Sequence, residues 1–217
     1  MAATKKTLHV VKRTRAAVTF PENVRALLPY NQNHFFRYRH GDADAHTPWY
    51  GASFQLASEA HNIARGINFG LSKYLDHYEP FFKQLVAQFD DGSCWLVTQD
   101  TRGYPWWPNE EPTLPALRAL FAQHRVPNAF HGALRMPTQA VFAFAQELLS
   151  YPTGVFSRER SLYSDVLVSH GTRPVVLQIS AHLNVDFLST DQELVRAVVK
   201  EHRSPAFTIK PYTGTSF

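Results

Sequence analysis

Alternation of side chains within residues 174–188 constrains the fold more than any other feature of this sequence. Apolar and hydrogen-bonding residues alternate strictly from Gln178 to Phe187. Since successive side chains of a β-strand point to opposite faces, the pattern predicts one strand over 174–188 with its odd-numbered side chains in the core. A carboxylate in place of Leu183 is then expected to be severely destabilising, and the same change at Asn184 to be mild.

The polar half of this run is a candidate site. Its groups are short and can both donate and accept hydrogen bonds, whereas solvated sheet faces usually carry Lys, Glu and Thr. Three interpretations follow: a solvent-facing sheet surface, a polar groove that binds a ligand, or a nucleophile or metal role for His182 and Asp186. The polar positions are Gln178, Ser180, His182, Asn184 and Asp186.

The rest of the chain mixes helical and extended patterns without an internal repeat or an obvious linker. Apolar residues at three- and four-residue steps predict helices, and β-rich runs bounded by turn residues predict strands. The expected helices cover residues 56–78, 79–89, 114–125, 138–150 and 190–202, and the expected strands cover 34–40, 93–99, 164–169, 174–188 and 207–209. Thr190 and Glu193 form a capping box for the last helix.

This order of elements predicts the fold class. It indicates a single α+β domain over residues 1–217, with a mixed or antiparallel sheet and about five helices packed on it. The basic segment 1–40 is expected to contribute strands to that sheet.

The first forty residues carry a strong positive charge. They hold eight Lys or Arg and one acid, for +7, whereas the other 177 residues hold 14 bases and 17 acids, for −3. Such asymmetry points to an anionic partner for the basic segment. Interleaved aromatic rings can stack unpaired bases, which favours single-stranded nucleic acid over duplex. The expected nucleic-acid-binding residues are Lys5, Lys6, Lys12, Arg13, Arg15, Phe35, Arg37, Tyr38 and Arg39.

Two alternatives apply to this basic segment. Its arginines can be merely solvated, or paired with Asp42 and Asp44, as surface charges usually are. An acid-free start is also typical of an organelle presequence. Residues 8–11 and 16–20, however, favour extended structure over the amphipathic helix that a presequence forms.

A loop over residues 100–112 contains three aromatic side chains among prolines. Tyr104, Trp106 and Trp107 are expected to bind a protein partner, because Trp is enriched among interface hot spots. Adjacent indoles can equally fill the protein's own core. The sequence does not separate these two interpretations.

Residues 40–46 alternate imidazoles and carboxylates. His40, Asp42, Asp44 and His46 are all of the types that hold zinc or manganese, although Gly and Ala between them are typical of a flexible polar loop. The chain has no HExxH, Walker A or GxSxG motif. We therefore expect no bound metal and no cofactor.

One order of residues carries a family resemblance. Arg37 or Arg39 is followed far downstream by Asp165, an apolar run over 166–168 and a Gly-Thr pair at 171–172. This order is similar to that of ADP-ribosyltransferases, which place Arg or His on an early aromatic strand and a catalytic Glu before such a run. Asp165 stands where the family has Glu, and no clear serine-rich strand intervenes. The resemblance implies a transferase as a secondary alternative.

These observations favour a non-catalytic, nucleic-acid-binding subunit of a nucleoprotein assembly. The first alternative is a protein-binding inhibitor or immunity-type module, and the second is the ADP-ribosyltransferase-like enzyme. No apolar run approaches the ~18 residues that cross a bilayer, so no membrane partner is expected. The single cysteine, Cys94, excludes an internal disulfide. We expect a cytoplasmic location or another reducing intracellular compartment.

Overall fold

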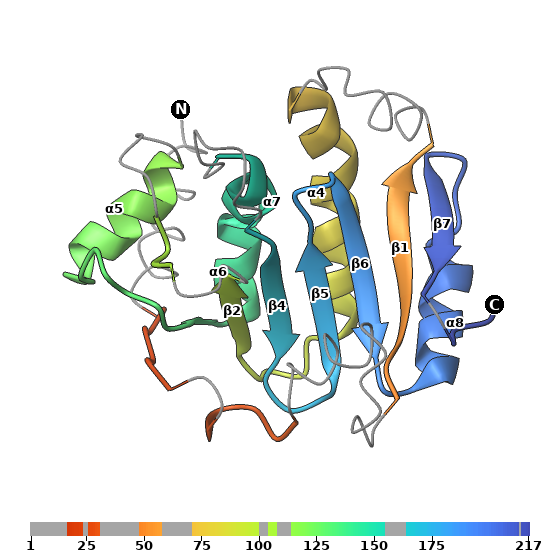
Figure 1. Cartoon of the computed structure of the whole chain (residues 1–217), viewed down its shortest axis with the longest axis horizontal. Helices are drawn as coiled ribbons and strands as arrows, with labels where there is room; N and C mark the ends of the chain where they lie inside the picture. The colour runs from red at the N-terminus through yellow and green to blue at the C-terminus, as the bar shows by residue number, and fades with distance from the viewer. Residues whose placement is uncertain are drawn as a thin grey trace, which may run out of the picture.

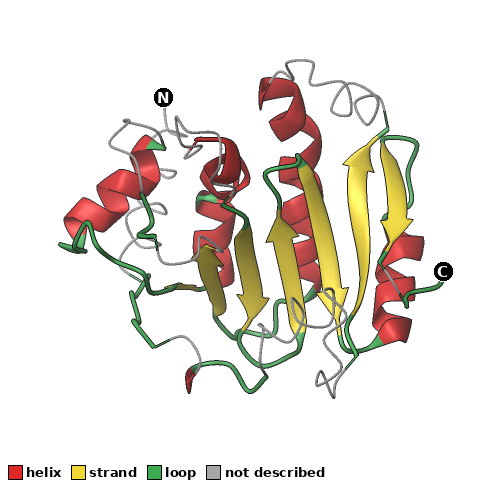
Figure 2. Ribbon diagram, viewed as in Figure 1, coloured by secondary structure: helices red, strands yellow, loops and turns green. Residues whose placement is uncertain are grey.

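A seven-stranded antiparallel sheet organises the computed structural model (Figures 1 and 2). The structure describes residues 17–23, 26–30, 48–57, 71–99, 104–107, 114–154, 164–212 and 214–217. The strands are β1 (Tyr50–Leu56), β2 (Trp95–Gln99), β3 (Leu134–Met136), β4 (Val166–His170), β5 (Val175–Ile179), β6 (Asn184–Ser189) and β7 (Phe207–Pro211). They lie in the order β3-β2-β4-β5-β6-β1-β7, and each neighbouring pair is antiparallel.

Five helices are described with this sheet, which confirms the predicted α+β class. They are α4 (Leu71–Gln88), α5 (Pro115–Gln123), α6 (Thr138–Ala143), α7 (Ala145–Gly154) and α8 (Gln192–Glu201). Four of them, α4, α6, α7 and α8, lie along one face of the sheet, whereas α5 stands apart beyond β2 (Figure 1).

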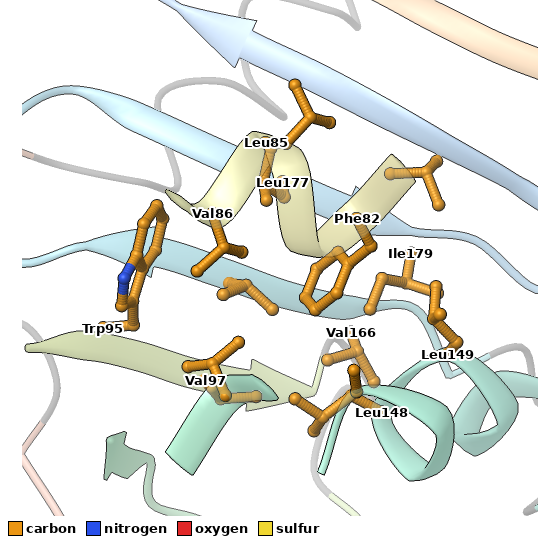
Figure 3. Close-up of a cluster of buried hydrophobic side chains, with 14 of the residues drawn as sticks. Phe82, Leu85, Val86, Trp95, Val97, Leu148, Leu149, Val166, Leu177 and Ile179 are labelled. Carbon is orange, nitrogen blue, oxygen red and sulfur yellow. The ribbon is translucent and has the colours of Figure 1, made fainter. Parts of the chain in front are cut away.

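The core lies between the sheet and the helices on that face. Side chains of α4 and α7 point toward the strands (Figure 3). Phe82, Leu85 and Leu148 are completely buried against strand residues that include Val97 and Leu177. Burial of one such side chain stabilises the fold by about 1.5 to 3 kcal/mol relative to its exposure, so this layer fixes how α4 and α7 sit on the sheet.

One long helix, α4, stands where the sequence predicts a boundary between two helices. It continues through Pro80, which lacks an N–H and therefore removes one backbone hydrogen bond from the helix. Buried residues on both sides of the proline, such as Tyr78 and Phe82, offset this loss by packing on the sheet. The predicted helical start at Leu56 is wrong, because Leu56 ends β1. Residues 58–70 lie outside the described part of the chain.

The predicted single strand over residues 174–188 is wrong. The segment forms two strands, β5 and β6, joined by a turn over 180–183. Within the turn, the N–H of Leu183 donates to the carbonyl of Ser180 at 3.0 Å, and Leu183 has a φ of 61°. The turn does not change which side chains share a face. The odd-numbered apolar residues of both strands therefore face the helices, as predicted.

Smaller differences concern helix and strand boundaries. The predicted helix over 138–150 is two helices, α6 and α7, separated at Phe144. The N-cap of α8 is Asp191, whose Oδ1 accepts from the N–H groups of Glu193 and Leu194 at 2.9 and 3.2 Å, so the capping box at Thr190 is wrong by one residue. Strands β1 and β3 were not predicted, and the predicted strand 34–40 lies outside the described residues.

Tyr78 joins α4 to the sheet and provides a test of the fold. Its buried hydroxyl lies 2.8 Å from the carbonyl of Phe54 and 3.1 Å from that of Leu183, to which it donates, and it accepts from the N–H of Leu56 at 3.1 Å. Burial raises the pKa of this phenol well above its usual range, so the hydroxyl keeps its proton.

Tyr78→Phe is expected to lower the free energy of unfolding by about 2 to 3 kcal/mol, because buried backbone groups lose their partner. Urea denaturation measures this change. Tyr104→Phe is the matched control, since Tyr104 is 45 % exposed and its loss of a hydroxyl should change stability by less than about 0.5 kcal/mol. Equal midpoints for the two variants would contradict the assigned contact.

Candidate functional site

A lobe built on α5 lies beside the sheet and carries the candidate site (Figure 1). We call residues 104–107 and 114–133 the α5 lobe. The helix follows Leu114, which has a φ of 57°. Its first N–H groups, on Ala116 and Leu117, donate to the two carboxylate oxygens of Glu147 at 2.8 and 2.6 Å. A carboxylate is favourable at a helix N-terminus, so this contact holds the lobe against α7.

The described residues nearest the N-terminus are fixed on this lobe. We call residues 17–23 the N-terminal anchor. The N–H and carbonyl of Thr19 pair with the carbonyl and N–H of Arg135 at 3.1 and 2.8 Å, and the carbonyl of Pro21 accepts from the N–H of Ala133 at 2.9 Å. The anchor therefore extends the sheet at β3.

Packing secures the anchor as well. The ring of Phe20 lies 5.2 Å from that of Phe121, 5.1 Å from that of His124 and 6.0 Å from that of Phe130. Aromatic pairs at these separations contribute about 0.5 to 1.5 kcal/mol each beyond burial. The first described residue, Ala17, is therefore part of a segment held on the α5 lobe, and it follows Arg15 by two residues in the sequence.

The lobe contains a cavity of about 660 Å³ with aromatic walls. We call it the aromatic cavity. Arg118 is the charged residue among the described residues that line it, and the Cζ atom of Arg118 lies 4.8 Å from the centroid of the Trp107 ring. A guanidinium over an indole is a cation–π contact, which holds both side chains in place. Other lining residues include Pro105, Trp106, Phe121, Val126 and Pro127.

The two adjacent tryptophans differ in their environments. Trp106 is 1 % exposed, and its Nε1 donates to the carbonyl of Gly132 at 2.9 Å, so it fills the core and is not an exposed anchor for a partner. Trp107 is half-buried, and its Nε1 is buried without a hydrogen-bond partner among the described residues. Tyr104 is exposed. Of the expected partner-binding residues, Tyr104 and Trp107 are therefore accessible.

A second hollow adjoins the aromatic cavity. It measures about 350 Å³ and is lined by anchor residues Val18, Thr19 and Phe20 together with residues of the lobe. Val126 and Pro127 line both spaces, so one stretch of chain separates them. The anchor and the aromatic cavity are thus neighbours on the surface of the lobe.

The polar face predicted from the alternating run is present but buried, so the solvent-facing interpretation is wrong. Gln178 pairs with Asp186 across β5 and β6, and Asp186 pairs with Ser53 across β6 and β1. Gln178, Asn184, Asp186 and Ser53 are each at most 6 % exposed. The described contacts make this row a hydrogen-bonded cross-link between strands.

Hydrogen bonds within the row occupy several of its polar groups, although the Oε1 of Gln178 is buried without a partner among the described residues. The Nδ2 of Asn184 donates to Asp186 and, at 3.1 Å, to the Oγ of Ser53, while the hydroxyl of Tyr212 donates to the other carboxylate oxygen of Asp186. Buried polar groups that are satisfied in this way specify how strands pair. His182 does not belong to the row, because it is exposed in the 180–183 turn.

Asp165, the residue singled out by the transferase resemblance, has a local partner for each carboxylate oxygen. One oxygen accepts from the Nε2 of Gln178 and the other from the N–H of Ala181 at 2.9 Å. Asp165 therefore caps the turn after β5. Arg37 and Arg39 lie outside the described residues, so the structure does not place them relative to Asp165.

A serine and a histidine that the sequence did not single out lie in contact. The Oγ of Ser93 is 3.1 Å from the Nε2 of His170. The Nδ1 of His170 accepts from the N–H groups of Thr172 and Arg173 at 3.3 and 3.2 Å, so in the neutral ring the proton is on Nε2, facing the carbonyl of Phe89 at 2.9 Å. That nitrogen cannot also act as a base for Ser93. The pair supports the loop at the end of β4.

Asp91 completes this cluster. Its carboxylate accepts from the N–H of Ser93 at 3.0 Å and lies 3.5 Å from both the Nε2 of His170 and the Nε of Arg173. Hydrogen bonds from the side chain and backbone of Ser93 lower the pKa of Asp91 to about 2. The carboxylate is therefore ionised at neutral pH and stabilises the turn.

Several predicted site residues lie outside the described part of the chain. They are Lys5, Lys6, Lys12, Arg13, Arg15, Phe35, Arg37, Tyr38, Arg39 and the cluster from His40 to His46. The described residues contain no group of three or more metal-ligating side chains. Among the described helices, none has the length and apolar character needed to cross a bilayer.

Sequence reasoning missed Arg118 and Phe20 as parts of the site. Arg118 lies on an ordinary amphipathic helix, and its contact with Trp107 is invisible to any local pattern. Phe20 meets a helix about one hundred residues later in the chain. The aromatic loop itself is the signal that sequence did provide.

Comparisons of the chain with protein-family models, with curated protein sequences and with solved structures found no match.

Proposed function

We propose that the protein binds single-stranded nucleic acid at the α5 lobe, as a non-catalytic subunit of a nucleoprotein assembly. One observation carries the proposal: the chain that follows the basic residues Lys12, Arg13 and Arg15 is fixed beside the aromatic cavity. In the sequence, Arg15 stands two residues before Ala17, the first residue of the anchor.

The charge of the lobe supports the same partner. Of the described residues, Arg125 and Arg135 are exposed on or next to the lobe, Arg118 lines the cavity, and Glu22 is the acid that lines the second hollow. Phosphates neutralised by such cations release counterions, which is the main driving force for binding nucleic acid without sequence preference. Aromatic side chains beside a cationic surface add stacking, which only unpaired bases offer.

Binding of a fluorescent oligothymidine or oligouridine, followed by anisotropy across a salt series, tests this proposal. If four or five phosphates are neutralised, log K should fall with log salt at a slope of roughly −3 to −3.5. Changing Lys12, Arg13 and Arg15 together to Ala should flatten the slope by about 2, at ~0.7 per phosphate contact.

The matched control changes Lys200, Arg203 and Lys210 to Ala. These three residues are exposed at the opposite end of the molecule, around α8 and β7. The control should leave the slope unchanged. Absence of binding at low salt, or equal slopes for the two triple variants, would reject the proposal and favour the protein-binding module.

A further inference from the structure

We infer that the groove holding the N-terminal anchor also receives the anchor of a second copy of this chain, so that exchanged anchors link neighbouring subunits on one nucleic-acid strand. This inference rests on the proposed function and names the contact between subunits of the assembly. Its evidence is the fit of the groove to an extended segment, the contacts of the anchor and the difference between the two edges of the described sheet.

The groove is shaped for an extended segment of chain. We call it the anchor groove, and it consists of Phe121, Phe130, Gly132, Ala133 and Arg135. The N–H groups of Ala133 and Arg135 and the carbonyl of Arg135 pair with the backbone of the anchor. A Cβ at Gly132 would lie 2.3 Å from the carbonyl oxygen of Pro21, so the missing side chain leaves room for that backbone. Recognition through backbone groups and one aromatic side chain is typical of strand addition to a sheet edge.

A second copy can supply every described contact of the anchor. Among the described residues, three backbone hydrogen bonds hold the anchor, and the Phe20 ring packs edge to face on Phe121 at 5.2 Å. Thr19 and Glu22 are exposed, and the hollow of about 350 Å³ lies between anchor and lobe, so the lobe does not enclose the segment. Residues 17–23 of another copy would make the same contacts. Occupancy by the chain's own anchor and by a neighbour's therefore differ only in the connecting chain.

The opposite edge of the described sheet is less suited to pairing between copies. Its strand, β7, ends at Pro211, which has no N–H to donate and is exposed together with Lys210. The N–H of Phe207 already donates to the carbonyl of Ser204 at 3.3 Å. Proline and lysine on an edge strand hinder the addition of another strand. Sheet pairing between copies is therefore expected at β3, where the anchor lies.

Binding to a shared strand favours exchange. In the free protein the anchor is tethered to its own groove, and a short tether gives an effective concentration in roughly the millimolar range. Subunits held side by side on one strand bring neighbouring grooves to a comparable local concentration. Arg15 stands two residues before the anchor in the sequence, so the proposed nucleic-acid contact and the exchanging segment are adjacent in the chain. We therefore expect each anchor in its own groove in free protein, and exchange on the strand.

A disulfide trap distinguishes the two arrangements. Thr19 and Arg135 are a hydrogen-bonded antiparallel pair, and residues paired in this way have Cα atoms about 5.5 Å apart, which a disulfide can span. The trap is Thr19→Cys with Arg135→Cys in the full chain, where Cys94→Ser removes the one native cysteine. Thr19 and Arg135 are both exposed, so the fold should tolerate the changes. Oxidation gives an internal disulfide when the anchor is in its own groove and a covalent dimer or longer species when anchors are exchanged.

The variant is oxidised alone, with an oligothymidine of about 10 nucleotides and with one of about 60, because single-strand sites cover ~4 to 16 nucleotides. A non-reducing gel separates the products. Internal disulfides are expected for free protein and on the short strand. On the long strand about half of the chains should be in covalent dimers or longer species, since the two effective concentrations are comparable. The matched control is Thr19→Cys with Lys200→Cys in the same background, which should give few covalent dimers because Lys200 is exposed on α8, at the other end of the molecule.

Anisotropy with the same strands, labelled, measures binding under the same conditions and separates this inference from the proposed function. Internal disulfides alone on a long strand that the variant binds would overturn the inference and leave the proposed function intact. Covalent dimers in equal amount with and without the long strand would also overturn it, because exchange would not depend on a shared strand. Failure of the wild-type chain and the variant to bind either strand would reject both.

Discussion

Asn184→Asp is expected to lower the free energy of unfolding by about 3 to 5 kcal/mol. The amide Nδ2 of Asn184 donates to Asp186 and to Ser53 in a row where Asn184 and Asp186 are 6 % and 2 % exposed. The substitution replaces that donor by a second carboxylate, so two buried like charges face each other and the hydrogen bonds are lost. Urea denaturation at neutral pH measures the loss.

Two further measurements define this prediction. The penalty should shrink as the pH falls, because protonation of one carboxylate removes the repulsion and restores a donor. Leu183→Asp is the control, and it should lose no more than about 1.5 kcal/mol. Leu183 is half-buried in the turn at a φ of 61°, a conformation that Asp adopts more readily than Leu. A larger loss for Leu183→Asp than for Asn184→Asp would contradict the burial of the polar row.

From the sequence alone, Leu183→Asp is expected to be more destabilising than Asn184→Asp, and the structure reverses this order for a physical reason. A period of two shows which side chains share a face, and it correctly places Val185 and Phe187 in the core. The same period does not reveal a turn after which the alternation continues unchanged. Residues 180–183 contain neither Gly nor Pro, which would mark such a turn. Nor does alternation tell which face is covered, since both faces of this hairpin are buried.

Other elements escaped prediction because tertiary contacts override local preference. The short run Gly51-Ala52-Ser53 lacks strong β-formers, yet β1 lies between β6 and β7. A Cβ at Gly51 would lie 2.5 Å from the Cδ2 of Leu188 and 2.7 Å from a ring carbon of Tyr212, so a larger residue there would displace these side chains. Similarly, Pro80 lies within α4 between helical turns whose side chains, such as Tyr78 and Phe82, are buried.

The candidate site was predictable only in its composition. The basic segment and the aromatic loop are visible in the sequence, but the position of residues 17–23 beside the α5 lobe depends on long-range contacts. The bridge between Thr19 and Arg135 and the packing of Phe20 on α5 join parts of the chain that are about one hundred residues apart. No local period encodes such contacts, whereas the amphipathic faces of α5 and α8 made those helices easy to predict.

Gly132→Ala is expected to displace the N-terminal anchor from β3. A Cβ at this position would lie 2.3 Å from the carbonyl oxygen of Pro21 and 2.6 Å from a ring carbon of Phe130. The first of these atoms belongs to backbone, so the anchor itself must move. Overpacking and loss of the hydrogen bond from Ala133 to Pro21 together should lower the free energy of unfolding by about 2 to 4 kcal/mol.

Hydrogen exchange measures the displacement directly. The amides of Thr19 and Ala133 both donate to partners across the junction of the anchor and β3, so both should exchange faster in Gly132→Ala. Gly92→Ala is the matched control: Gly92 has a φ of +82° with nothing within 4 Å of an added Cβ, so it should cost about 1 to 2 kcal/mol through backbone strain alone. That control should leave both amides protected. If Gly132→Ala leaves them protected as well, the anchor is not held at β3, and the proximity on which the proposed nucleic-acid surface depends is lost.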